Sequence, residues 1–387
     1  MRYSVFFLLV LSSSLAWAQA YLQYSEACSK EDNIQITAVG DVLLHSPLQI
    51  QASKNQDRFL SLWPRMIPIF QNADIAYANL EGPVAPGVLA TGNEAKDPGF
   101  LFDNRVYGSY PQFNYHSYLI QDLVKSSIDI LSTANNHSLD RRSLGVDRTI
   151  EELEKEGVAF TGTRSTREMN RPWHAITQVK GRTVAWLACT FSTNGITDKF
   201  KQVLSCYENT NELLNMVRDL SRQPGIDAVI VTPHWGVEYN LKPHESQVWL
   251  GRKFIEAGAT AVIGTHPHVI QPWEKYKSSN GREGFIIYST GNFVSGQDHL
   301  PRRTSVMVQL NLTGEKGQKL KIRGVQFLPL FMQKGSGGYQ VSPIFNFETG
   351  VPAAAVSLWK QMYNEKQRIL SVNEETVQKI CEASSKD

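Results

Sequence analysis

Short apolar runs rich in β-branched residues alternate along the chain with stretches whose apolar positions recur at helical spacing. The short runs predict strands at 34–39, 75–78, 128–132, 183–190, 228–232, 261–264 and 285–289. The helical spacing predicts helices at 59–70, 117–125, 144–156 and 245–257. Strands that alternate with helices are typical of a layered α/β protein.

Three segments depart from this alternation. Residues 82–110 are rich in Gly, Pro, Asn and Asp, and they predict a long connection of the kind that is often functional. Residues 305–330 lack helical periodicity and predict two or three antiparallel strands. A Gly/Ser hinge at 334–338 is then expected to lead into a helical stretch at 353–381.

The N-terminus has the pattern of a secretory signal peptide. Arg2 precedes an apolar run that is too short for a stable membrane anchor, and Ala16-Trp17-Ala18 forms a small-x-small cleavage site. We therefore expect cleavage near Ala18 and a mature protein in the periplasm or outside the cell. The predicted division is a signal peptide at 1–18, an N-terminal lead-in at 19–33, one domain at 34–330 and a helical C-terminal tail at 331–387.

An exported chain permits disulfides among its four cysteines. Cys28 and Cys381 lie near the two ends of the mature chain and could form one pair. Cys189 falls in a predicted buried strand, so we interpret it as a buried free thiol. Because no C-x-x-C is present, the spacing indicates neither a zinc ribbon nor a redox site.

The composition mainly excludes classes of protein. Of 387 residues, 39 are Lys or Arg and 37 are Asp or Glu, which gives a formal net charge of +2, and 42% are hydrophobic. These values argue against a disordered chain or a protein with many membrane spans. They also lack the basic excess of a nucleic-acid-binding surface, so we expect no nucleic-acid partner.

Polar side chains that can bind a metal follow five of the predicted strands. In chain order these residues are Asp41 and His45, Glu81, Asn136 with His137 and Asp140, His234, and His266 with His268. In open α/β sheets ligands bind beyond the carboxyl ends of the strands, so we expect these side chains to lie close together. Imidazole, carboxylate and amide oxygen favour a divalent ion such as Zn, Mn or Fe, and two ions that share a carboxylate form a hydrolytic site.

Each of these residues also has an ordinary structural interpretation. Asp41 could cap a helix or form a turn, and Glu81 could be a solvated turn residue. His137 could be a loop histidine bonded to Asp140, and His234 could simply be packed. Only His266-Pro267-His268 favours a metal by itself, but the conjunction of all the segments favours a metal site.

Six segments carry a specific resemblance. They are Thr37-Ala38-Val39-Gly40-Asp41, Ala78-Asn79-Leu80-Glu81, Ala134-Asn135-Asn136-His137-Ser138-Leu139-Asp140, His234-Trp235-Gly236-Val237-Glu238-Tyr239, Gly264-Thr265-His266-Pro267-His268-Val269-Ile270-Gln271-Pro272 and Tyr288-Ser289-Thr290-Gly291-Asn292-Phe293. Together they resemble the bacterial capsule-synthesis CapA family of poly-γ-glutamate biosynthesis, within the calcineurin-like metallophosphatase superfamily. The resemblance implies an α/β fold, a four-layered α/β/β/α metallophosphatase-like sandwich over 34–330.

The resemblance also assigns roles by position. It implies metal ligands at Asp41, at Glu81 as the bridging carboxylate, at Asn136 through its amide oxygen, and at His234, His266 and His268. It makes His137 the residue that assists the leaving group, with Asp140 orienting it. The superfamily has Asp-x-His on its first strand, whereas this chain has Asp41-x-x-x-His45. We include His45 as a further metal-ligand candidate. Glu238 and Tyr239 could face substrate or pack beneath His234, and Asn292 is interpreted as a turn residue.

The function implied is a periplasmic hydrolase linked to poly-γ-glutamate capsule synthesis or export. A metal-activated water would attack a phosphoester or related bond, with a divalent metal, as two ions of Mn, Zn or Fe, as the cofactor. The expected partners are an anionic polymer or phosphoester substrate and capsule-synthase membrane proteins. The alternatives are a non-catalytic metal-binding factor for capsule-polymer assembly or export, and a general periplasmic phosphatase.

Overall fold

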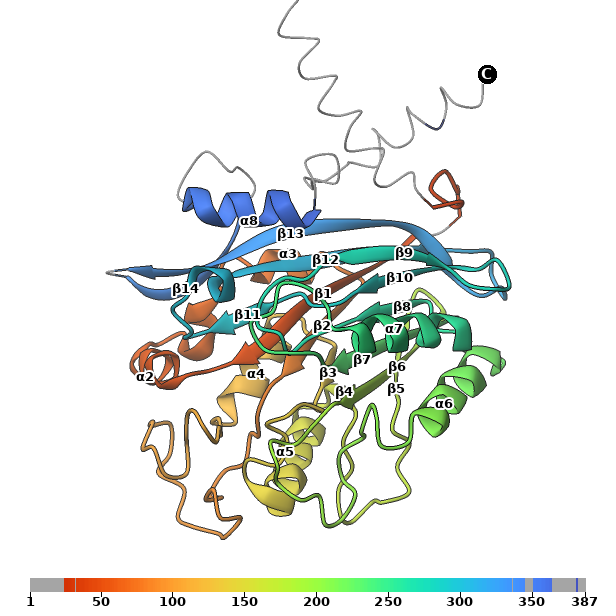
Figure 1. Cartoon of the computed structure of the whole chain (residues 1–387). Coiled ribbons are helices and arrows are strands. Elements are labelled where there is room, and N and C mark those ends of the chain that lie inside the picture. The colour runs from red at the N-terminus through yellow and green to blue at the C-terminus, as the bar shows by residue number, and fades with distance from the viewer. Residues whose placement is uncertain (1–23, 32, 336, 345–350, 364–380, 382–387) are drawn as a thin grey trace, which may run out of the picture.

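Two β-sheets packed face to face form the centre of the protein in a computed structural model (Figure 1). The structure describes residues 24–31, 33–335, 337–344, 351–363 and 381. The predicted signal peptide at 1–18 lies outside these residues. No helix within the described part of the chain has the length and apolar character needed to cross a membrane.

The larger sheet has eight strands, most of them from the first and last thirds of the chain. They are β1 (Asn33–Leu43), β2 (Ile75–Leu80), β3 (Ile130–Ser132), β4 (Ala159–Thr161), β11 (Asn292–Ser295), β12 (Thr304–Thr313), β13 (Lys321–Gly335) and β14 (Gly338–Pro343). The order is β14-β13-β12-β1-β2-β3-β4, and β11 pairs with the second half of β1. Strands β1 to β4 run parallel, whereas β12 to β14 are antiparallel, as predicted for 305–330.

The smaller sheet has six strands from the middle of the chain. They are β5 (Ala175–Val179), β6 (Arg182–Thr190), β7 (Ala228–His234), β8 (Ala261–Ile263), β9 (Trp273–Lys277) and β10 (Glu283–Ile287), in the order β5-β6-β7-β8-β10-β9. The four central strands run parallel and are almost wholly buried, which is why they read as continuous apolar runs and were predicted. The antiparallel edge strands β5 and β9 are partly exposed and more polar, and the pattern did not predict them.

Helices cover the outer face of each sheet, except that the last helix packs on the apolar cluster of the inner face. They are α2 (Ser46–Lys54), η1 (Arg58–Leu62), α3 (Ile67–Gln71), α4 (Tyr118–Lys125), α5 (Arg142–Glu156), α6 (Thr210–Arg222), α7 (Glu245–Ala257), η2 (Leu300–Arg303) and α8 (Ala353–Tyr363). Apolar side chains of α2, α4 and α5 pack on the larger sheet, and those of α6 and α7 pack on the smaller one. The predicted four layers, α/β/β/α, are therefore confirmed.

One apolar cluster lies beneath the helices of each sheet, and a third lies between the two sheets and holds them together. At its centre Tyr77 of β2 and Trp186 of β6 stack nearly parallel, with ring centroids 5.5 Å apart. Both side chains are fully buried. Because aromatic rings bury large areas, this contact helps to fix the spacing of the sheets at the middle of β2 and β6.

Several predicted boundaries are wrong for local reasons. The helix expected at 59–70 is split into η1 and α3, because Pro64 and Pro68 interrupt the backbone hydrogen bonding. The hinge expected at 334–338 lies at the turn between β13 and β14, so the boundary expected at 330 falls inside β13. Only α8 represents the predicted helical tail among the described residues, and 364–380 lie outside them (Figure 1).

The cysteines form two disulfides. Cys28 pairs with Cys381, as the sequence allowed. Cys189 pairs with Cys206, so its interpretation as a free thiol is wrong. The apolar run around Cys189 correctly indicated burial, but pairing depends on how the chain returns after β6. There Cys206 donates its backbone N–H to the carbonyl oxygen of Thr190, beside Cys189.

Removal of the Cys189–Cys206 disulfide should destabilise the fold. The double variant Cys189→Ala/Cys206→Ala frees a loop with a sequence separation of 17 in the unfolded chain. We expect the free energy of unfolding to fall by about 3 kcal/mol, measured by urea denaturation with far-UV circular dichroism. Wild-type protein reduced with dithiothreitol, which also opens Cys28–Cys381, should lose at least as much. A loss below about 1 kcal/mol in both samples would contradict the expectation.

Candidate metal centre

Six of the predicted metal ligands meet where the carboxyl ends of the parallel strands of both sheets converge. The larger sheet supplies three of them and the smaller sheet the other three. They are Asp41 in β1, Glu81 directly after β2, Asn136 in the loop after β3, His234 at the end of β7, and His266 and His268 after β8. Each side chain is at most 2% exposed. The structure thus brings together residues that lie far apart in the sequence.

An irregularity in β1 positions Asp41. The pairing of β1 with β2 and with β11 shifts register at this residue, and the Asp41 N–H donates to the carbonyl oxygen of Gly291 at 3.2 Å. A Cβ atom on Gly40 would lie 1.8 Å from that oxygen, so only glycine fits there. Such bulges re-aim side chains near functional sites, and here the carboxylate is turned toward the histidines.

Glu81 is shared by two groups of potential ligands. Ligand atoms of Glu81, His266 and His268 lie within 4.8 Å of one another, and so do those of Asp41, Glu81 and His234. Oε1 of Glu81 is 3.5 Å from Nε2 of His234 and 3.7 Å from Nε2 of His268. Oδ1 of Asn136 lies 2.9 Å from the same His234 nitrogen.

The unpaired atoms of this group fit a metal. Both carboxylate oxygens of Glu81 and Nδ1 of His266 are buried without a hydrogen-bond partner among the described residues. A buried carboxylate without a partner is costly, and such a group in a native protein calls for an ion or water beside it. The set of carboxylate, amide oxygen and imidazole suits a divalent ion such as zinc, manganese or iron.

A surrounding layer of hydrogen bonds orients the ligands. Asn79 donates through Nδ2 to Oδ1 of Asp41 at 2.8 Å. Nδ1 of His268 lies 3.1 Å from Oδ2 of Asp41 and 3.0 Å from Oδ1 of Asn292, which leaves its Nε2 directed at Glu81. Asn292 is therefore a strand residue that supports the site, and its interpretation as a turn residue is wrong. Such partners fix the orientation of metal-binding histidines.

His137 and Asp140 form a separate pair beside the metal-binding group. Nδ1 of His137 lies 2.7 Å from Oδ2 of Asp140, and the backbone N–H of Phe113 donates to the same oxygen at 2.6 Å. The ring of Phe113 packs edge-on against His137, with centroids 4.8 Å apart. The carboxylate therefore holds Nδ1, so Nε2 is the nitrogen left for chemistry.

His45 occupies a different position from the other six candidates. Its Nδ1 accepts from the backbone N–H of Gly296 at 3.3 Å and lies 3.2 Å from the carbonyl oxygen of Leu43. It does not belong to either potential ligand group found in the described residues. Compared with Asp-x-His, the two extra residues between Asp41 and His45 carry this histidine out of the strand to the start of α2.

The charges of the site depend strongly on burial. Burial lowers the pKa of His234 to about 3, which favours the neutral imidazole that metals bind. Burial also lowers the pKa of His268, but the carboxylates of Glu81 and Asp41 outweigh it and raise this pKa to about 9. Burial and the charge of Asp41 raise the pKa of Glu81 well above its ordinary value. Without metal, protonated His268 is therefore the main positive charge facing the carboxylates.

Two loops that the sequence did not connect with the site lie beside it. Arg141 is buried and donates to the carbonyl oxygens of Val88, Val106 and Gln112, so it holds the long loop at 82–110 next to His137. The loop closed by Cys189–Cys206 places Phe191 on His266, with ring centroids 4.4 Å apart. Neither contact has a signal in local sequence, because each joins segments that are distant in the chain.

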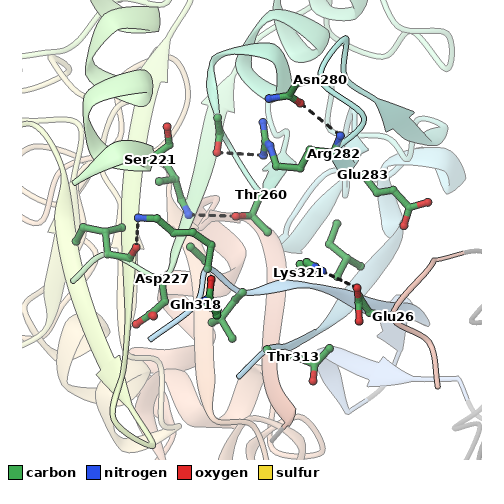
Figure 2. Close-up of a pocket in the computed structure, with 18 of the residues that line it drawn as sticks. Glu26, Ser221, Asp227, Thr260, Asn280, Arg282, Glu283, Thr313, Gln318 and Lys321 are labelled. Atoms are coloured by element: carbon green, nitrogen blue, oxygen red, sulfur yellow. Dashed lines mark hydrogen bonds and ion pairs between the residues drawn. The ribbon is translucent and has the colours of Figure 1, made fainter. Parts of the chain in front are cut away.

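A hollow of about 1100 Å³ opens at the opposite edge of the sheets (Figure 2). Thr313 at the end of β12 and Lys321 at the start of β13 line it, together with Asp227 just before β7. Part of its charged lining is paired within the protein; for example, Lys321 lies 2.7 Å from Glu26. None of the predicted metal-site residues lines this hollow.

Comparison with known proteins places the chain among capsule-synthesis proteins. Residues 35–297 match the family described as "Bacterial capsule synthesis protein PGA_cap". The capsule biosynthesis protein CapA of Bacillus anthracis is 26% identical over 82% of this chain and 74% of its own length. The PGA biosynthesis protein CapA of Bacillus subtilis (strain 168) is 26% identical over 87% of this chain and 77% of its own length. A phosphatase crystal structure from Mycoplasma pneumoniae has 12% identity and a TM-score of 0.42, covering 78% of this chain and 94% of that one.

Replacing the shared carboxylate should stabilise the metal-free protein. Because the pKa of Glu81 is raised in the fold, folding favours its protonated form, and that stabilisation is lost as pH rises above the ordinary value of 4.5. We expect metal-free Glu81→Gln to exceed metal-free wild type by roughly 1–3 kcal/mol in unfolding free energy at pH 7.5, with a smaller gap near pH 4.5. Urea denaturation in the presence of a chelator measures this difference in unfolding free energy.

A matched control is available at an exposed glutamate. Glu315→Gln removes the same charge far from the site and should leave the unfolding free energy almost unchanged at both pH values. If the metal-free Glu81→Gln protein is less stable than wild type at pH 7.5, burial of the Glu81 carboxylate does not destabilise the metal-free fold.

Proposed function

This chain belongs to the family of the bacterial capsule synthesis protein PGA_cap, and we propose that it is a metal-dependent hydrolase acting outside the cytoplasm in the synthesis or export of a poly-γ-glutamate capsule. The family predicted from the six sequence segments is thereby confirmed. The substrate we propose is an anionic polymer or a phosphoester, and capsule-synthase membrane proteins are the proposed partners.

One observation carries the proposal of hydrolysis. The carboxylate of Glu81 is buried without a hydrogen-bond partner among the described residues and is shared by two groups of ligand atoms. A purely structural buried carboxylate would be hydrogen-bonded, because burial of a charged group without hydrogen-bond partners is unfavourable. When bound, two divalent ions would acidify a water molecule and neutralise negative charge on the substrate.

The protein's own residues perform the remaining tasks. Asp41, Glu81 and Asn136 would provide oxygen ligands and the three histidines nitrogen ligands. Thr265 contacts Nδ1 of His234, and Asp41 contacts Nδ1 of His268. His137 holds a proton on Nε2 for the leaving group, while Asp140 fixes Nδ1. The apolar rings of Phe113 and Phe191 limit access of bulk water around His137 and His266.

The disulfides support a location outside the cytoplasm. All four cysteines are paired in disulfides. Structural disulfides persist in the periplasm or outside the cell rather than in the cytosol. This agrees with the signal peptide expected at 1–18.

The metal can be tested directly. Purified mature protein should contain about two divalent ions per chain by elemental analysis, and it should hydrolyse an activated phosphodiester or poly-γ-glutamate in a chelator-sensitive manner. Glu81→Gln should hold one ion or none and lose activity, because the shared ligand is gone, whereas Glu315→Gln should behave as wild type. Wild-type protein that binds both ions but cleaves neither substrate would replace hydrolysis with a non-catalytic role in capsule assembly or export.

The role of His137 predicts a dependence on the leaving group. His137→Ala should lower kcat by roughly 100- to 10,000-fold for a substrate with an alkoxide leaving group, which must be protonated as it departs. The loss should be much smaller for a p-nitrophenolate leaving group, which is stable without a proton. Steady-state kinetics on the two substrates measures the difference, and metal content should stay unchanged. Equal losses on both substrates would assign His137 a different role.

A further inference from the structure

An arginine at the rim of the metal centre has no partner for its charge in the described part of the chain. Arg302 lies in η2, and its guanidinium carbon is 3.4 Å from the ring centroid of Tyr239. Among the described residues, no carboxylate or carbonyl oxygen accepts a hydrogen bond from this guanidinium, and it forms no ion pair. The adjacent Arg303, by contrast, is bonded within the protein and donates through Nε to the carbonyl oxygen of Met332.

Backbone and side-chain contacts tie Arg302 to the metal-binding histidines. Tyr239 donates its N–H to the carbonyl oxygen of Pro267, between His266 and His268, and its ring lies 6.0 Å from that of His268. Asn292, which contacts His268 through Oδ1, donates through Nδ2 to the backbone oxygen of Arg302 at 2.8 Å. Both ends of the Arg302–Tyr239 stack are therefore fixed relative to the ligands.

We propose that Arg302, held on the ring of Tyr239, is an anion-binding subsite that receives a carboxylate of an acidic polymer next to the bond held at the metal centre. The guanidinium is planar and can bind a carboxylate through two parallel hydrogen bonds while one face remains stacked on an aromatic ring. A γ-linked glutamate polymer presents one free carboxylate on each residue, so it supplies such a group beside every linkage. This inference rests on the proposed function for its substrate class.

The exposure of the stack favours a ligand role over a structural one. Tyr239 is 41% exposed, and the neighbouring Glu238 is also exposed and makes no ion pair with Arg302 among the described residues. A stack that served only to hold η2 would be expected to pair its charge within the protein, as Arg252 does. Arg252 lies over Tyr276 but also forms an ion pair with Glu274 at 2.9 Å.

Binding of a short γ-linked glutamate oligomer tests the proposal without turnover. The measurement uses calorimetry at fixed ionic strength, in mature protein that carries His137→Ala so that the oligomer stays intact. Adding Arg302→Ala should weaken binding roughly 10- to 100-fold, because a charge-assisted contact is lost. Arg302→Lys should recover part of the affinity, because it keeps the charge without the planar fork.

Arg252→Ala is the matched control, because it removes the same charge and another arginine–tyrosine stack on the surface of α7. It should change the affinity less than twofold. A γ-linked oligomer whose free α-carboxylates are converted to carboxamides should bind equally well with and without Arg302. Metal content and far-UV circular dichroism confirm that each variant is folded.

The outcomes separate this inference from the proposed function. Equal losses for Arg302→Ala and Arg252→Ala, or no loss for Arg302→Ala, would overturn the subsite. Failure of metal-loaded protein to bind the oligomer at all would overturn it too, while hydrolysis of a phosphodiester could still stand. Protein that holds no metal but binds the oligomer through Arg302 would refute the metal-dependent hydrolase and support the subsite.

Discussion

The burial of Glu81 between two imidazoles is the constraint on which the rest of the site depends. Its carboxylate lies within 4 Å of His234 and His268, yet neither oxygen has a hydrogen-bond partner among the described residues. Such a group destabilises a fold unless a cation sits beside it. The surrounding protein has to hold it there without collapse, and the closely packed sheets on either side supply that rigidity.

The two-sheet architecture explains how ligands from distant segments converge. Each sheet contributes parallel strands whose carboxyl ends open on the same edge. The stack of Tyr77 on Trp186, in the middle of β2 and β6, keeps the two sheets in fixed relation. Neither sheet alone carries a complete set, because the carboxylates come from one and the histidines from the other. The metal centre is therefore a property of the packed sandwich, and a change in the spacing of the sheets would change the distances between ligands.

The sequence predicted the central strands and their polar ends because both are local patterns. Buried parallel strands read as apolar runs, and the residue that follows each run can be identified without knowing the fold. The partners that orient the ligands could not be found in this way. Asn79 and Asn292 contact ligands from other strands, and the pairing of Cys189 with Cys206 depends on where the chain returns. His45 shows the opposite error. Its residue type and its proximity to Asp41 in the sequence predicted a metal ligand, but it lies at the start of α2 and outside both ligand groups of the described residues.

Backbone strain links the metal-binding histidines to the rim of the site. His266 and His268 both have positive φ, 95° and 57°, a conformation that L-residues rarely adopt and that costs about 1–3 kcal/mol each where the surroundings enforce it. This geometry turns both imidazoles inward and leaves the carbonyl oxygen of Pro267 to accept from Tyr239, which also has positive φ. Because Phe113 and Phe191 cover His137 and His266, the side of His268 that bears Tyr239 and Arg302 is the more open approach. The backbone conformation that directs His266 and His268 inward thus also positions Tyr239 and Arg302 at the rim, where a substrate would first contact the site.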